Sequence, residues 1–68
     1  MIYILCSSMV LKDGTIISNL FEDVFTDSYK AERQFDAMIL TKKCPRKQLW
    51  VKKPGGERIL LKEEKFNG

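Results

Sequence analysis

Histidine is absent from this 68-residue chain, and cysteine is scarce, with Cys6 and Cys44 the only two. Zinc sites are built from Cys and His at close spacing, which two cysteines so far apart do not offer. Nucleophilic catalysis needs a base beside a Ser or Cys, and no such motif occurs. Basic neighbours would favour the thiolate of Cys44, but a structural thiol is the simpler interpretation. We therefore expect no catalytic residues, no metal site, no cofactor and no enzymatic activity.

Long hydrophobic runs are lacking as well. The most apolar stretch, residues 2–11, has about half of the roughly 20 residues that a membrane helix needs, and no basic segment precedes it as in a secretory signal. With 44% hydrophobic and 31% charged residues, the composition is that of a folded soluble protein. The sequence predicts one small domain, residues 1–68, in the cytoplasm and without membrane contact.

Positive charges outnumber negative ones, and the two signs are unevenly distributed along the chain. The net charge is +3. Residues 1–41 hold three cationic and six acidic side chains, net −3, whereas residues 42–68 hold nine cationic and three acidic ones, net +6. A surface divided in this way would steer charged partners toward one part of the molecule.

The N-terminal part predicts two strands. Residues 2–11 are apolar at both alternating sets of positions, which favours an inner strand. Asp13-Gly14 between apolar runs is typical of a hairpin turn, so a return strand follows at 15–25, with a bulge near Ser18-Asn19. A short helix is the competing interpretation, because four apolar residues recur at helical spacing: Ile17, Leu20, Phe21 and Val24.

A helix is predicted next. Thr26 or Asp27 can cap its start, and Lys42 with Lys43 would suit the negative end of its dipole before Pro45 stops it. Its apolar stripe, expected to pack on the sheet, comprises Ala31, Phe35, Met38 and Ile39.

The C-terminal segment Gln48–Lys62 predicts a hairpin around the only Pro-Gly-Gly of the chain. Pro54 presets φ for the first corner, and glycine adopts positive φ without steric cost. A three-residue loop with Gly56 as the left-handed residue of a bulge places Lys53 opposite Glu57.

That loop also fixes the register of the two strands. Four aliphatic side chains would share the face toward the helix: Leu49, Val51, Ile59 and Leu61. The other face would carry Trp50 against Leu60, flanked by three cations: Lys52, Arg58 and Lys62. A slip of one residue would set Leu49 against Lys62 and mix the faces. The polar tail, 63–68, is expected to fray.

The predicted fold is α+β, in the order strand, strand, helix, strand, strand. One helix packed on one face of a mostly antiparallel sheet would bury the helical stripe and the aliphatic face of the hairpin together.

Two surfaces are candidates for binding a partner. The first is the outer face of the hairpin, with Trp50, Lys52, Arg58, Leu60 and Lys62. Aromatic and cationic side chains together favour a protein partner with an acidic surface. Alternatives are a nucleic acid whose bases stack on the ring, a homodimer or structural subunit, or a tryptophan that is simply core. The secondary surface, on the back of the helix, comprises Tyr29, Arg33, Asp36 and Leu40. The alternative is that Tyr29 and Leu40 are scattered exposed apolar residues without a binding role.

The helix start Asp-Ser-Tyr-Lys-Ala-Glu (27–32) and the strand segment Leu-Trp-Val (49–51), together with the layout of the whole chain, resemble short accessory proteins encoded by bacteriophages and mobile elements. The resemblance implies a protein that binds a host machine, such as a polymerase, a nuclease or a defence complex, in the host cytoplasm and inhibits or redirects it. It carries no site residues with it.

Overall fold

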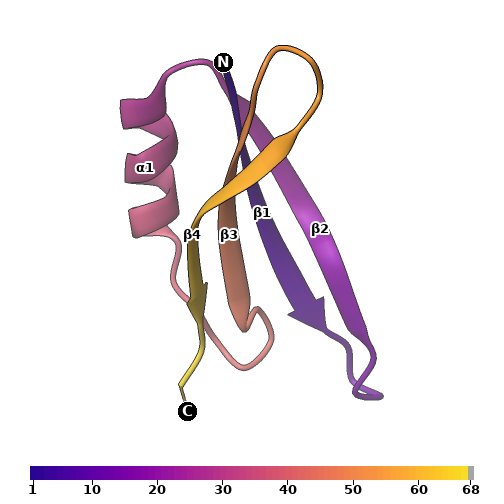
Figure 1. Ribbon diagram of the computed structural model, residues 1–68. Helices are drawn as coiled ribbons and strands as arrows, with labels where there is room; N and C mark the ends of the chain where they lie inside the picture. The colour runs from indigo at the N-terminus through magenta and orange to yellow at the C-terminus, as the bar shows by residue number, and fades with distance from the viewer. Residues whose placement is uncertain (68) are drawn as a thin grey trace.

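The computed structural model describes residues 1–67, apart from the side chains of residues 18–21. The predicted order and the α+β class are confirmed. The elements are β1 (Ile2–Val10), β2 (Ile16–Phe25), α1 (Ser28–Ala37), β3 (Arg46–Lys52) and β4 (Arg58–Lys65), with the helix on one face of the sheet (Figure 1).

The sheet has four antiparallel strands in the order β2-β1-β3-β4. β1 is therefore an inner strand, as its apolar residues on both faces predict. Under α1 lies a core of four buried side chains: Leu5, Ala31, Phe35 and Leu49. Tyr3, Phe25 and Met38 pack against it from the side.

The β1–β2 turn forms as the Asp-Gly pair predicts. Gly14 has φ +88°, a conformation that side chains rarely adopt, and the Leu11 amide donates to the Thr15 carbonyl at 2.8 Å. The Thr15 amide also donates to the Asp13 carboxylate at 2.9 Å, and this bond lowers the pKa of Asp13.

β2 is a strand along its whole length, so the helical alternative for this segment is wrong. Its pairing with β1 shifts between Ser7, opposite Phe21, and Met9, opposite Ile17. This is the irregularity that the sequence places near Ser18-Asn19. The side chains of Leu20 and Phe21, on which the helical stripe depended, lie outside the described residues.

α1 begins as predicted and ends earlier. Asp27 caps it, accepting a hydrogen bond from the Tyr29 amide at 2.9 Å. The helix ends at Ala37 because Met38 already has an extended backbone, with ψ 126°. Lys42 and Lys43 therefore lie in the following loop rather than at the helix end, and Ile39 is 83% exposed instead of packed. The predicted position of Lys42 and Lys43 at the helix end and the predicted packing of Ile39 on the sheet are therefore wrong.

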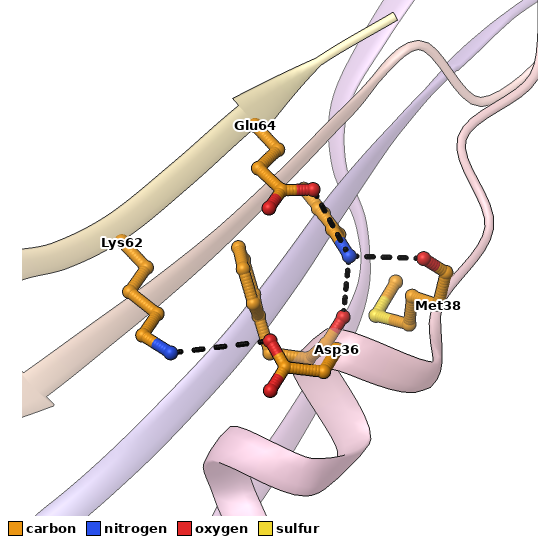
Figure 2. A network of polar contacts seen from close by, with 6 residues as sticks. Asp36, Met38, Lys62 and Glu64 are labelled. Atoms are coloured by element: carbon orange, nitrogen blue, oxygen red, sulfur yellow. Dashed lines mark hydrogen bonds and ion pairs between the residues drawn. The ribbon is translucent and has the colours of Figure 1, made fainter.

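A lysine from another strand supplies the charge at the end of α1. Lys47 of β3 is only 3% exposed, and its Nζ donates to the carbonyl oxygens of Phe35 at 2.6 Å and of Met38 at 2.9 Å. The carboxylate of Glu64 lies 3.3 Å from the same nitrogen (Figure 2). The aliphatic core therefore contains one cation, which ties the last carbonyls of the helix to the sheet.

The β3–β4 turn also forms as predicted. Gly55 and Gly56 have φ values of +107° and +105°, and the Lys53 amide donates to the Glu57 carbonyl at 3.1 Å. Next to the turn the register is the predicted one, with Val51 opposite Ile59.

Farther from the turn the register shifts by one residue. Leu49 lies opposite Lys62, not Leu61, because an irregularity interrupts the pairing between Leu49 and Trp50. Leu61 is consequently 47% exposed, and its place in the predicted four-residue aliphatic face is wrong. Ile59 shares the face of Val51 as predicted, although it is 39% exposed on the edge strand.

The shift brings charged residues of β4 to the helix side. Lys62 approaches Asp36 of α1 at 3.9 Å, and Glu64 approaches Lys47, as Figure 2 shows. Lys62 therefore faces away from Trp50, contrary to prediction. Residues 63–65 belong to β4 rather than to a frayed tail, and the Phe66 amide donates to the Pro45 carbonyl at 2.7 Å.

Candidate functional site

The face of the sheet opposite α1, called the open face below, carries an apolar row across all four strands. Side chains alternate along a strand, so the neighbours of core residues Leu5 and Leu49 point to this face. The register aligns four of them: Val24 of β2, Ile4 of β1, Trp50 of β3 and Leu60 of β4. The ends of the row are exposed, Val24 by 61% and Leu60 by 41%, whereas Trp50 is half-buried.

The centre of the open face is buried although α1 lies on the other side. Ile4 is 4% exposed and Cys6 only 1%. Arg58 of β4 and Glu22 of β2 meet over them, with 2.9 Å between Nη2 and Oε1. These residues come from the two edge strands, so the pair spans β1 and β3. The twist of the sheet allows side chains of its two edge strands to approach each other, and this contact is called the Arg58–Glu22 clasp below.

Cys6 lies beneath the clasp. Burial raises the pKa of its thiol, the negative charge of Glu22 raises it further, and Arg58 opposes both effects. The thiol therefore stays protonated near neutral pH and reacts slowly. Cys44, the other free cysteine, is half-buried in the loop before β3.

We expect the clasp to control access to Cys6. In a Cys44→Ser background, Arg58→Ala should raise the rate at which iodoacetamide labels Cys6, expressed per thiolate, by about fivefold, since a partly exposed ion pair contributes about 1 kcal/mol. The rate is expressed per thiolate because losing Arg58 also raises the pKa of the thiol. Mass spectrometry of the native protein measures the rate. Lys53→Ala, in the adjacent turn, is the matched control and should leave it unchanged. An equal rate in both variants would show that the clasp does not cover the thiol.

Four of the five residues predicted for the partner-binding surface come together on the open face: Trp50, Lys52, Arg58 and Leu60. Lys62 does not join them. The indole Nε1 of Trp50 donates to the side-chain oxygen of Gln48 at 3.3 Å, and Gln48 in turn donates to Glu63. The ring is therefore half-buried within the row, and its hydrogen bond to Gln48 holds it in place.

The secondary surface is only partly assembled. Tyr29 is 64% exposed, with the guanidinium of Arg33 5.6 Å from its ring, and Asp36 faces Lys62. Leu40 lies beyond the end of α1, where it lines a pocket of about 200 Å³ with Cys44. The four residues therefore do not form one helical face.

Sequence reasoning missed Val24 and Glu22 as parts of the site. Both lie on the segment whose helix or strand character was open, and only the pairing of β2 with β1 aligns them with Trp50 and Arg58. Within residues 1–67, no three acidic or cysteine side chains gather to hold a metal ion, and no helix is long and apolar enough to cross a membrane. No family model, curated protein or solved structure matches the chain.

Proposed function

We propose that this chain is a non-enzymatic protein-binding module that docks its partner on the open face. The observation that carries the proposal is the apolar row, whose ends Val24 and Leu60 are 61% and 41% exposed on either side of a half-buried tryptophan. Interfaces concentrate their binding energy in aromatic side chains that a surrounding rim keeps dry.

The charges around the row define the chemistry of the partner. Lys52 of β3 lies opposite Arg58 of β4 in the strand register, next to Trp50 and Leu60. Arg58 already faces Glu22, so a partner with an apolar centre and an acidic rim would chiefly complement Lys52. Such rim charges act mainly on association rate and specificity. By its resemblance to accessory proteins of phages and mobile elements, the module would inhibit or redirect a host complex in the cytoplasm.

Nucleic-acid binding through the C-terminal hairpin is less well supported. Two of its cations already face carboxylates, Arg58 at 2.9 Å from Glu22 and Lys62 at 3.9 Å from Asp36.

A homodimer through the row would give a mass that rises with concentration in light scattering, whereas a binder of other proteins stays monomeric.

We expect Leu60→Asp and Val24→Asp each to weaken partner binding by about thirtyfold, because a charge at a hot spot costs about 2 kcal/mol. Ile39→Asp is the matched control. Ile39 is an aliphatic residue of similar size that is 83% exposed and lies outside the open face, so this variant should bind normally. The assay is affinity capture from host lysate treated with nuclease, followed by titration of the recovered partner. Circular dichroism of each variant confirms the fold.

Two outcomes would contradict the proposal. One is a partner that both aspartate variants still capture as well as the wild type. The other is recovery that nuclease abolishes, which would make nucleic acid the bridge.

A further inference from the structure

The positive charge of the C-terminal part is split between the two ends of the molecule. Three segments lie at the end of the molecule opposite the β3–β4 turn: the β1–β2 turn, the α1–β3 loop and the end of β4 (Figure 1). Backbone hydrogen bonds of 2.7 Å join them, from the Val10 amide to the Lys43 carbonyl and from the Phe66 amide to the Pro45 carbonyl. We call this region the basic end; its cations are Lys12, Lys42, Lys43, Arg46 and Lys65.

Acidic residues are fewer than basic ones in the segments of the basic end. The two loops, residues 11–15 and 38–45, contain a single one, Asp13. In β4, Glu63 lies 3.9 Å from Lys65, but the Lys65 side chain is 67% exposed, and such a surface contact is weak enough for a phosphate to displace. Glu64 is directed to Lys47 on the helix side. The basic end therefore presents excess positive charge, including a lysine from the acidic N-terminal part of the sequence.

A pocket of about 540 Å³ opens at the basic end. Its lining is Ser8, Ile16, Pro45, Arg46, Lys65 and Phe66. The register sets Ser8, Arg46 and Lys65 side by side on the open face. The pocket thus combines two cationic side chains with an aromatic ring, Phe66, that is 36% exposed.

We propose that this pocket binds a nucleotide of single-stranded nucleic acid, with its base against the ring of Phe66 and its phosphate at Arg46 and Lys65. A base has a flat face to stack on an aromatic ring, and its phosphate places a negative charge one sugar away. Lys43 and Lys12, in the adjoining loops, would meet the next phosphates along the strand. An acidic peptide satisfies the cations but leaves the ring without a planar partner.

This site is independent of the apolar row. The pair of Gln48 and Glu63 lies between the row at Trp50 and the pair of Arg46 and Lys65. The inference therefore stands or fails separately from the proposed protein-binding function, and a chain with both sites would bring a protein to a nucleic acid.

The test is fluorescence anisotropy with labelled oligothymidylate and oligouridylate of about 12 nucleotides, the size that one small domain covers. If three phosphates are contacted, affinity should fall about 20-fold between 50 and 200 mM salt. Lys65→Ala should reduce the slope of log affinity against log salt by about 0.7. Phe66→Leu should weaken binding about tenfold, and Phe66→Trp should preserve it.

Two controls separate this site from the rest of the molecule. Lys53→Ala removes one cation from the opposite end and should leave the affinity unchanged, as should Leu60→Asp, which disables only the apolar row. An oligoglutamate of equal charge should bind far more weakly than either oligonucleotide. Equal binding of oligoglutamate, or wild-type affinity of a folded Phe66→Leu variant, would reduce the pocket to a non-specific anion patch and overturn the proposal.

Discussion

Lys47→Met lowers the free energy of unfolding by about 3 kcal/mol. The ammonium of Lys47 satisfies the carbonyl oxygens of Phe35 and Met38, and the first of these bonds is buried. A hydrogen bond from a charged donor contributes about 1.5–3 kcal/mol, and Lys47→Met removes two of them. The Phe35 carbonyl then keeps only the Met38 amide, at 3.2 Å, and the charge at the helix end is lost as well. Methionine keeps most of the volume over the Phe35 ring, so the loss reports the charge and the hydrogen bonds rather than a cavity.

Urea denaturation, followed by tryptophan fluorescence and circular dichroism, measures the change. Lys62→Met is the matched control, because Lys62 also lies over the Phe35 ring, at 5.8 Å, but its side chain is 40% exposed. It should cost less than about 1 kcal/mol. If Lys47→Met and Lys62→Met have the same denaturation midpoint, the helix end does not depend on the buried cation.

We expect Trp50→Ala to lower the free energy of unfolding by about 2 kcal/mol, in addition to the loss of partner binding that the proposed function predicts. Removing a fully buried tryptophan costs about 3–5 kcal/mol, and Trp50 is only half-buried between Ile4 and Leu60. A chain of this size has a stability of only a few kcal/mol, so this variant and Lys47→Met should both populate the unfolded state on mild heating.

Binding data on Trp50→Ala therefore need a stability measurement beside them. Thermal melting followed by circular dichroism provides it, with Trp50→Phe as the control that keeps a ring in the row and should recover about half of the loss. A Trp50→Ala variant that melts like the wild type would place the ring outside the packed part of the open face, and its effect on binding would then be direct.

Features that depend on neighbours in sequence could be predicted from the sequence. Asp13-Gly14 and Pro54-Gly55-Gly56 form the turns because their backbone conformations are local properties. Asp27 caps the helix for the same reason. The apolar residues of β1 predict an inner strand, since only a strand covered on both faces can bury both alternating sets.

The candidate binding surface depended on which strands lie side by side. No local pattern distinguishes Lys47 from the other lysines of its basic segment, and only the packing of β3 under α1 places it at the helix end. The one-residue shift in β4 places Lys62 on the helix side, opposite Leu49 and 3.9 Å from Asp36, and the sequence of the turn does not specify this shift.

The sequence by itself determined the elements, their order and their turns, because these follow from short-range backbone preferences and hydrophobic periodicity. The tertiary structure alone decided the Arg58–Glu22 clasp, the extension of the apolar row to Ile4 and Val24, and the basic end. Each unites residues from strands far apart in the chain, and their meeting depends on sheet twist and strand order, which no stretch of sequence encodes separately.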